Sequence, residues 1–271
     1  MYALTLWITV MPLRDCFLPP FTSKVTRTAF YHLTGVVPRM RRMASFSVLF
    51  RDGKPLYRLY EDRWSEPLRA REGERLRARV SMLVARPPEP PTRSVTFQFG
   101  AAEMVAGVES VEIAQLKEAK LEVPRKFVVR FLTPTLLPVP GRGPLLKALG
   151  LRRRYRLLPD LPLALALLAH DFRLMGLDLV KRSPREVHEW GLRAIAELDY
   201  EVRPVTVLYS VRDGVPVTER GFVGYLSCEL LDPLSSAAEE LGVLLAYAQR
   251  FGLGKSRSVG FGHVEVAPLQ A

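Results

Sequence analysis

The chain has 271 residues, 48% of them hydrophobic, which is enough for one large core or two smaller ones. Its 39 lysine and arginine residues exceed its 28 aspartate and glutamate residues and give a net charge of +11. This excess favours a polyanionic partner, and nucleic acid rather than an acidic membrane, because no basic amphipathic anchor is present. The two cysteines, Cys16 and Cys228, are far apart and outside any CxxC motif, so the sequence indicates neither a disulfide framework nor a zinc site.

The apolar segments are too short or wrongly flanked to target a membrane. Residues 3–11 lack a basic lead and end at Pro12, unlike a signal peptide, and residues 161–169 are too short to span a bilayer. We therefore expect a cytoplasmic protein with no membrane partner. The absence of asparagine and the presence of only four glutamines are typical of a protein from a thermophile, in which heat-labile amides are depleted.

The first half of the chain has the pattern of a strand, a helix and then several strands. Residues 2–10 alternate as a strand, and Thr22 and Ser23 can cap a helix predicted over 24–36. Residues 62–75 are strongly charged, and their weak periodicity leaves helix and loop open. The other predicted elements are a hairpin over 45–60 around Asp52-Gly53 and strands over 76–86, 93–99 and 108–116.

The pattern begins again after a break at Pro124-Arg125-Lys126. The repetition predicts an α+β fold of two tandem ferredoxin-like (RRM-like) domains, 1–124 and 125–271, each built as β-α-β-β-α-β. The alternative is a single mixed α+β domain. The predicted elements of this half are a strand over 127–132, helices over 161–176 and 184–198, strands over 203–211 and 217–230 joined by Asp213-Gly214, a helix around Leu241–Ala248, and a strand over 261–266.

A glycine-rich loop, residues 252–262 (GLGKSRSVGFG), separates the last predicted helix from the last predicted strand. Glycines let the backbone come close to a ligand and turn successive N–H groups toward it, and with Lys255 and Arg257 nearby the favoured ligand is phosphate. The alternative is a glycine-rich turn with solvated charges. The loop fits neither a Walker motif nor a dinucleotide fingerprint, because it ends in a strand instead of opening a helix.

Three regions together resemble a known family. They are the glycine-rich loop, the N-terminal run from Met11 to Val25 that contains MPLRD and SKV, and the blocks VRFLTPTLL at 129–137 and RGFVG at 220–224. In this order they are similar to the CRISPR-associated endoribonucleases of the RAMP superfamily, which cut repeat RNA into guide units. The match brackets nearly the whole chain.

The resemblance implies a metal-independent endoribonuclease without cofactors that binds CRISPR repeat RNA and cleaves precursor transcripts. The 2′-hydroxyl attacks the adjacent phosphate and leaves a 2′,3′-cyclic phosphate. Partners implied are repeat RNA, a CRISPR effector complex and a second copy in a homodimer. One alternative is a non-catalytic RNA-binding RAMP subunit of an effector complex, and another is a structural RNA-packaging or ribosome-associated protein.

The sequence departs from many relatives where a catalytic histidine follows the first helix, since residues 38–45 (PRMRRMAS) contain none. His32, in that helix, shares a face with the apolar Val25 and Ala29, so it reads as a packed core residue with a catalytic base as the alternative. Lys24, Arg27 and Tyr31 share the polar face. Without the resemblance, these residues are expected to form a solvated helix surface. With it, the similarity to a branch lacking the histidine implies that Lys24 and Arg27 stabilise the transition state; the alternative is that Lys24 is the base, which requires cationic neighbours to lower its pKa.

The remaining candidate residues are basic or lie in the glycine-rich loop. Arg220 matches a basic position of the family block and joins the catalytic candidates with Lys24, Arg27, Tyr31 and His32. His170, His188 and His263 are explained by packing or exposure, and no acid–base pair or metal-ligand motif occurs. The predicted RNA-binding residues are Arg41, Arg42, Gly252, Gly254, Lys255, Ser256, Arg257, Ser258, Gly260 and Gly262.

Overall fold

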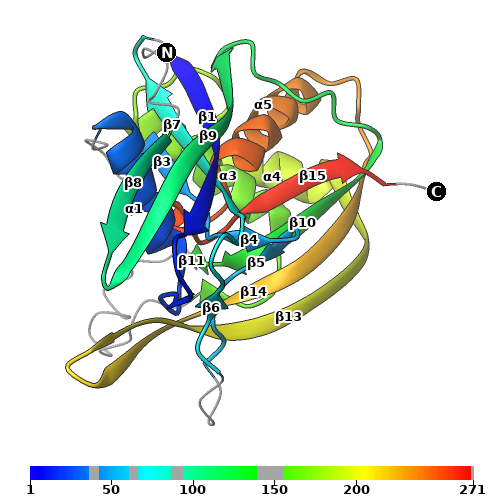
Figure 1. The fold of residues 1–271 in the computed structure, drawn as a ribbon. Coiled ribbons are helices and arrows are strands. Elements are labelled where there is room, and N and C mark those ends of the chain that lie inside the picture. The colour runs from blue at the N-terminus through cyan, green and yellow to red at the C-terminus, as the bar shows by residue number, and fades with distance from the viewer. Residues whose placement is uncertain (37–42, 61–65, 87–93, 139–154, 270–271) are drawn as a thin grey trace.

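The structure is a computed structural model that describes residues 1–36, 43–60, 66–86, 94–138 and 155–269. In this part of the chain, two larger antiparallel sheets carry the helices, and Figure 1 shows the sheets following one another along the chain. One sheet uses strands from residues 2–115 and the other uses strands from residues 126–268. The predicted α+β fold with two tandem ferredoxin-like domains is confirmed. The predicted domain boundary at 124/125 lies in the connection between these two sets of strands and stays a prediction.

The N-terminal sheet has the strand order β5-β4-β7-β1-β9-β8, with β3 also paired to β7. Alternate residues of β1, from Leu4 to Val10, are buried against helix α1. The elements of this domain are β1 (Tyr2–Pro12), β2 (Cys16–Phe17), α1 (Ser23–Thr34), β3 (Ala44–Phe46), β4 (Phe50–Arg51), β5 (Lys54–Pro55), β6 (Arg69–Ala70), β7 (Leu76–Val84), β8 (Ser94–Phe99) and β9 (Ala102–Gln115).

The C-terminal sheet has the order β13-β14-β10-β15, which is that of a complete β-α-β-β-α-β unit. Helices α3 and α5 pack on one face of it and bury their leucines there. The elements are β10 (Lys126–Thr135), β11 (Leu137–Pro138), β12 (Tyr155–Arg156), α3 (Leu161–Leu174), α4 (Pro184–Ala194), β13 (Ile195–Arg212), β14 (Val215–Leu230), α5 (Ser236–Phe251), the 3₁₀ turn η2 (Arg257–Val259) and β15 (Val264–Pro268).

Two predicted elements differ from the structure, whereas the strand predicted over 93–99 is observed as β8. Because β8 stands between β7 and β9, the described part of the N-terminal domain lacks the second helix of a complete β-α-β-β-α-β unit. Helix α4 ends at Ala194, and Ile195 already pairs with Leu230, so β13 starts well before the predicted residue 203. Strand β15 starts at Val264, because the segment before it forms η2, a turn at Gly260 and three residues without regular structure.

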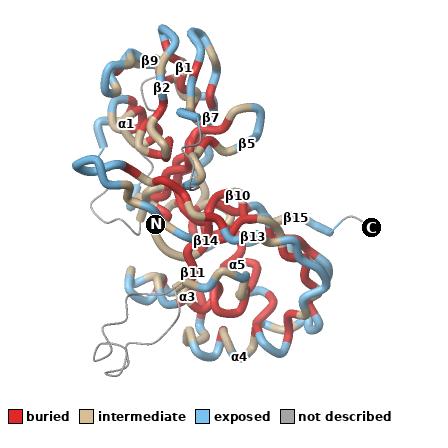
Figure 2. The backbone as a smooth tube through the Cα atoms, turned by 90° about the horizontal axis from the view of Figure 1, so that it is seen from below, coloured by how far each residue is buried: buried red, intermediate tan, exposed pale blue. Residues whose placement is uncertain are grey.

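The two domains are interlocked by segments that reach from one to the other. Helix α5 packs between its own sheet and the face of the N-terminal sheet that carries Ala3 and Leu83. Strand β13 passes along residues 58–60, where Leu208 N–H donates to the Arg58 carbonyl at 3.0 Å. Figure 2 shows a continuous stretch of buried backbone where the domains meet. The start of α1 and the glycine-rich loop lie in this junction.

Candidate functional site

The first turn of α1 is fixed at both domains by side-chain hydroxyls. Thr22 Oγ1 donates to the Leu56 carbonyl at 2.6 Å, and Ser23 Oγ donates to the Val259 carbonyl at 2.7 Å. Neither hydroxyl caps the helix as the sequence predicted. The two hydroxyls therefore attach the turn that carries Lys24 to a hairpin of its own domain and to the glycine-rich loop of the other.

Lys24 is half-buried at the boundary between the two domains. Its Nζ lies 4.9 Å from the centroid of the Tyr209 ring, which belongs to β13. Burial and the positive charges of Arg212 and Arg27 lower the pKa of Lys24, because each disfavours the ammonium form. The structure therefore brings Lys24 and Arg27 together as predicted, and adds Tyr209 and Arg212 from the C-terminal domain.

Tyr209 belongs to an aromatic cluster that both domains build. Its ring centroid is 5.7 Å from that of Phe21 and 6.1 Å from that of Phe261. Phe21 and Phe261 stack on each other at 4.5 Å and are fully buried. The buried members of this interdomain cluster are Phe21, Val48, Phe50, Leu136, Val207 and Phe261.

The glycines of the loop allow close approach to the protein itself. Gly260 has φ of 96°, and a Cβ there would lie 2.7 Å from Ser23 Cβ and 2.9 Å from Phe21 Cε1. At Gly254, with φ of 75°, a Cβ would lie 2.5 Å from the Leu136 carbonyl oxygen. Gly252 and Gly262 also have positive φ and approach one another's segment of the loop.

Much of the loop backbone is hydrogen-bonded within the protein. Lys255 N–H donates to the Leu136 carbonyl at 2.9 Å, and Gly262 N–H donates to the Pro134 carbonyl at 3.0 Å. The expectation that successive N–H groups face a phosphate is wrong for these two, because they tie the loop to β10 and the residues after it. Ser256 and Ser258 are half-buried in the turn, where Ser256 has φ of 64°.

The two cations of the loop have different surroundings. Arg257 is only 7% exposed; its guanidinium pairs with Asp171 of α3 and lies 5.7 Å from the Tyr247 ring centroid. The charge of Arg257 is therefore buried and neutralised inside the domain, and its role in RNA binding stays a prediction. Lys255 is half-buried, with Nζ 3.4 Å from the Tyr155 hydroxyl oxygen, so its role in RNA binding stays a prediction.

His32 is exposed, so its predicted place in the core is wrong. The buried arc of α1 is centred near Leu33, with Val25 at one edge and His32 just outside it, as the rotation of about 100° per residue shows. Its ring stacks on Phe97 of β8 at 5.6 Å. Tyr31 is half-buried and packs edge-on against Phe46, with ring centroids 6.2 Å apart.

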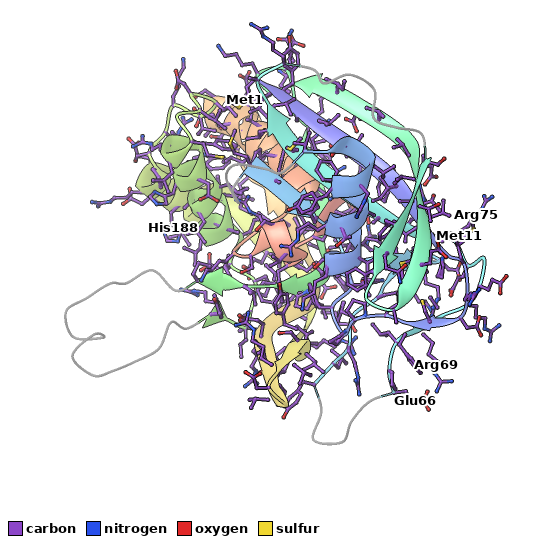
Figure 3. The ribbon with its side chains drawn as sticks, turned by 60° about the vertical axis from the view of Figure 1, so that its left-hand side comes forward. Met1, Met11, Glu66, Arg69, Arg75 and His188 are labelled. Carbon is purple, nitrogen blue, oxygen red and sulfur yellow. The ribbon has the colours of Figure 1, made fainter. Side chains whose placement is uncertain are left out.

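The other predicted residues lie on other elements than α1 or outside the described part. Arg220 is exposed on β14 opposite Thr206, and its catalytic role stays a prediction. Arg41 and Arg42 lie outside the described residues. His170 is exposed, and Figure 3 shows His188 on α4, on the opposite side of the molecule from Arg69 and Arg75.

His263 is buried directly after the glycine-rich loop. Its backbone N–H donates to Thr133 Oγ1 at 2.9 Å, and its ring centroid lies 5.8 Å from that of Phe50. Burial, followed by the positive charge of Arg79, holds the pKa of His263 well below its usual range. The imidazole is therefore neutral and packs in the junction between the domains.

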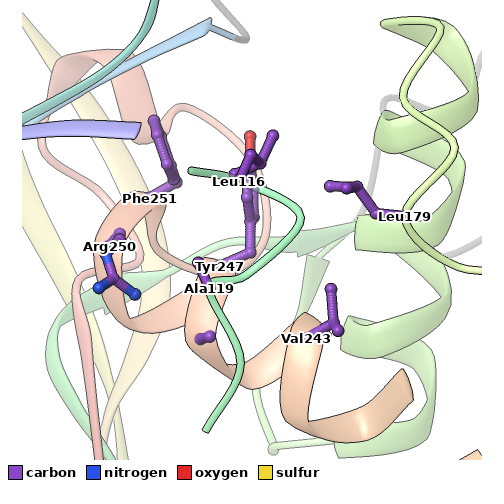
Figure 4. Close-up of a pocket in the computed structure, with 8 residues that line it drawn as sticks. Leu116, Ala119, Leu179, Val243, Tyr247, Arg250 and Phe251 are labelled. Carbon is purple, nitrogen blue, oxygen red and sulfur yellow. The ribbon is translucent and has the colours of Figure 1, made fainter. Parts of the chain in front are cut away.

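The described part of the chain has a pocket of about 330 Å³ lined by Arg156, Asp160, Leu192 and Glu197 among others, and Lys24 is not part of its lining. Over residues 1–36, 43–60, 66–86, 94–138 and 155–269, no three His, Cys, Asp or Glu side chains are grouped to hold a metal ion, and no helix could span a membrane. Figure 4 shows a small pocket beside α5, where Val243, Tyr247 and Phe251 face Leu116 and Leu179. Its lining is mainly apolar and does not include Lys24.

The residues that the sequence did not single out are Tyr209 and Arg212. Both lie near the end of β13, just before the Asp213-Gly214 turn that the sequence does predict. No local pattern shows that this turn belongs to a hairpin that reaches the first helix of the other domain.

Two tandem ferredoxin-like domains, with a helix and a glycine-rich loop meeting at their junction, place the protein in the class of two-domain RAMP-type folds. The model of the Cas6 N-terminal domain matches residues 4–114, and that of the CRISPR-associated endoribonuclease Cas6 matches residues 129–264. The chain belongs to the Cas6 family of CRISPR-associated endoribonucleases.

Solved structures show the same fold at low sequence identity. A Cas6 product complex is 18% identical over 98% of this chain and 100% of its own, with a TM-score of 0.62. Thermus thermophilus Cas6 is 17% identical over 98% of both chains, with a TM-score of 0.57. A Cas6-related protein from Pyrococcus furiosus is 12% identical over 98% of this chain and 100% of its own, with a TM-score of 0.53. No curated protein matches the chain.

Proposed function

We propose that this protein binds CRISPR repeat RNA and cuts precursor transcripts within the repeat to give guide RNAs. The reaction is metal-independent: the 2′-hydroxyl upstream of the cut attacks the adjacent phosphate, and the products carry a 2′,3′-cyclic phosphate and a 5′-hydroxyl. Family membership supports the substrate class and the cleavage. The observation that carries the site is the half-buried Lys24, fixed at the domain junction with Arg27 and Arg212 close by.

Lys24 and Arg27 act in this mechanism as cations that stabilise charge on the pentacoordinate phosphorus. Preorganised positive groups at a partly desolvated site stabilise such a transition state more than water does. The bound RNA supplies the in-line geometry. Lysine is a poor base near neutral pH, so turnover is slow, which suits an enzyme that keeps its product as a guide carrier.

RNA contacts beyond the catalytic helix come from basic residues around the same junction. Lys255 is the described candidate, and Arg41 and Arg42 join it from the predicted set, while Arg220 remains a candidate for catalysis. Such contacts position the phosphate backbone and carry little sequence information. The glycines of the loop serve this surface indirectly, because they hold Lys255 beside Leu136.

The test is to incubate purified protein with end-labelled repeat RNA in EDTA and to analyse the product ends. We expect one cut, a 2′,3′-cyclic phosphate and a 5′-hydroxyl, and no cleavage when the upstream 2′-hydroxyl is replaced by hydrogen. A 3′-hydroxyl product, or strict dependence on Mg²⁺, contradicts the mechanism. Binding without any cut favours a non-catalytic RNA-binding subunit.

Variants of α1 then assign the site. Lys24→Ala and Arg27→Ala should each lower the single-turnover rate by about tenfold or more, while RNA affinity falls less. Lys181→Ala removes an exposed lysine just before α4 and serves as the matched control. Equal rates in Lys24→Ala and Lys181→Ala would remove Lys24 from the mechanism.

A further inference from the structure

Tyr209 contacts Lys24 from the opposite domain through an irregularity in β13. Strand pairing passes from Leu208–Thr218 to Ser210–Val217, so Tyr209 is the extra residue of a β-bulge. A bulge changes the direction of a side chain relative to the regular strand, and bulges are common beside active sites. Here the redirected ring lies 4.9 Å from Lys24 Nζ.

The ring has little freedom to move away from Lys24. Phe21 and Phe261 contact it from the interdomain cluster, and Phe21 directly precedes the first turn of α1. The strand that carries it is attached to the N-terminal domain, since Tyr60 N–H donates to the Thr206 carbonyl at 2.8 Å and Leu208 N–H donates to the Arg58 carbonyl. The bulge and the cluster therefore hold Tyr209 in one position relative to the helix.

Lys24 needs such a contact because its neighbours repel it. Arg27 lies on the same helix as Lys24, and Arg212 lies on the same strand as Tyr209. The positive charges of both arginines repel the ammonium group of Lys24. A lysine side chain has four flexible carbons, so repulsion alone would turn the ammonium group toward solvent. The face of an aromatic ring attracts a cation, and it does so more strongly where the cation is partly desolvated.

We propose that Tyr209 is a positioning residue for Lys24, holding its ammonium group at the junction where the scissile phosphate binds. The inference rests on the proposed role of Lys24 in cleavage. Tyr209 acts through the face of its ring and not through its hydroxyl. The C-terminal domain thereby determines the geometry of a residue that the N-terminal domain supplies.

A double-mutant cycle tests this role. Single-turnover cleavage rates with saturating repeat RNA are measured for the wild-type chain, Tyr209→Leu, Lys24→Ala and the double variant. We expect Tyr209→Leu to lower the rate by about tenfold, with a smaller change in RNA affinity, and to have no further effect when Lys24 is already alanine. Tyr209→Phe keeps the ring face and should restore the wild-type rate.

Tyr57→Leu is the matched control for lost aromatic packing, because Tyr57 packs on Phe21 in the same cluster, with ring centroids 6.1 Å apart. Its effect on the rate should be the same with Lys24 present or absent. If Tyr209→Leu does not fold, Tyr209→Met, which keeps apolar bulk without a ring face, takes its place in the cycle.

Three outcomes are distinguished. Equal losses from Tyr209→Leu in both backgrounds would show that the ring supports only the fold, and would overturn the proposal. A loss in Tyr209→Phe as large as in Tyr209→Leu would assign the effect to the hydroxyl and also overturn it. An unchanged rate in Lys24→Ala would refute the catalytic role of Lys24 itself and, with it, the reason for positioning it.

Discussion

The surroundings of Lys24 determine which form of its amine is present when RNA arrives. Burial comes first among the causes that lower its pKa, and the charges of Arg212 and Arg27 follow. A bound phosphate reverses the balance, because its negative charge favours the ammonium form. In the proposed mechanism, the ammonium group of Lys24 therefore gains from the negative charge that develops on the phosphate during cleavage.

Replacing Arg212 should shift the pH dependence of cleavage upward. In the free enzyme, Lys24 loses its proton as pH rises through its lowered pKa, and the rate falls there because the cation is lost. Arg212→Gln removes a positive neighbour, so the pKa of Lys24 rises and the falling limb of kcat/KM moves to higher pH by a fraction of a unit. Measuring kcat/KM across alkaline pH, corrected for uncatalysed RNA hydrolysis, checks this.

Arg203→Gln, which removes an exposed arginine from the same strand, is the control and should leave the limb in place. A rate that instead rises through this pH range in the wild-type enzyme would make Lys24 a general base. If the fall of kcat/KM at alkaline pH stays at the same pH in Arg212→Gln, a group other than Lys24 controls it.

For single residues, the sequence predicts which side chains share one face of a helix, but it does not predict which residues of other elements contact them. Lys24, Arg27 and Tyr31 lie together on α1, as a rotation of 100° per residue predicts. The same rotation wrongly placed His32 in the core, because the prediction took Val25 as the centre of the buried face. The buried face is determined by the elements that pack on the helix, and Val25 lies at its edge. Arg257 and Lys255 are two positions apart but differ in burial, because Arg257 forms a buried ion pair with Asp171 of α3.

The glycine-rich loop attaches α1 to the C-terminal domain. Ser23 donates to Val259, and Ser45 Oγ lies 3.4 Å from the Arg257 carbonyl oxygen. A Cβ at Gly260 would lie 2.7 Å from Ser23 Cβ, so a side chain there would collide with the start of the helix. The loop therefore affects the position of Lys24 without contacting it.

Two alanine substitutions separate this docking role from backbone strain. Gly260 and Gly214 both have positive φ, 96° and 77°, but a Cβ at Gly214 would meet nothing within 4 Å. Gly214→Ala should cost about 1 kcal/mol from strain alone, and Gly260→Ala should cost more and also slow cleavage. Chemical denaturation and single-turnover rates check this, and equal costs with equal rates would mean that the loop does not position α1.

Elements with strong periodicity and clear end signals are predicted well. The first helix, predicted over 24–36, is observed as Ser23–Thr34 and stops at Gly35 in the left-handed conformation. The hairpin turn at Asp52-Gly53 is confirmed. The switch from α4 to β13 at Ile195 could not be predicted, because a long pairing with β14 overrides the local helical pattern.

The junction between the domains buries charge as well as aromatic rings. Nε and Nη2 of Arg79 are buried without a hydrogen-bond partner among the described residues, and burial lowers the pKa of Arg79 to about 10. The neutral His263 faces this cation. Protonating His263 would place two positive charges together in a buried site, which is unfavourable.

The free energy of unfolding should therefore decrease as the pH falls. The pKa of His263 in the folded chain lies below the usual value near 6.5 that applies to the unfolded chain. At a pH between these two pKa values, His263 is protonated in the unfolded chain but not in the folded chain. The stability is fully present above about pH 6.5 and should fall by about 1.4 kcal/mol for each unit below it, until the folded pKa is reached.

Denaturation of wild type and His263→Phe between pH 7.5 and 5.5 checks this, because the variant should lack that part of the slope. His170→Gln removes an exposed histidine and should keep the wild-type slope. Identical slopes in wild type and His263→Phe would contradict the assignment.

The bulge at Tyr209 and the turn at Val259 have a consequence for the order in which the chain is made. Lys24 leaves the ribosome early, while Tyr209 follows 185 residues later (209 − 24), after about 10–40 s of synthesis at typical rates. A nascent or truncated N-terminal domain then carries the lysine without the ring and turn that position it. On the proposed role of Lys24, efficient cleavage therefore requires that the C-terminal domain has been made and has folded onto the first helix.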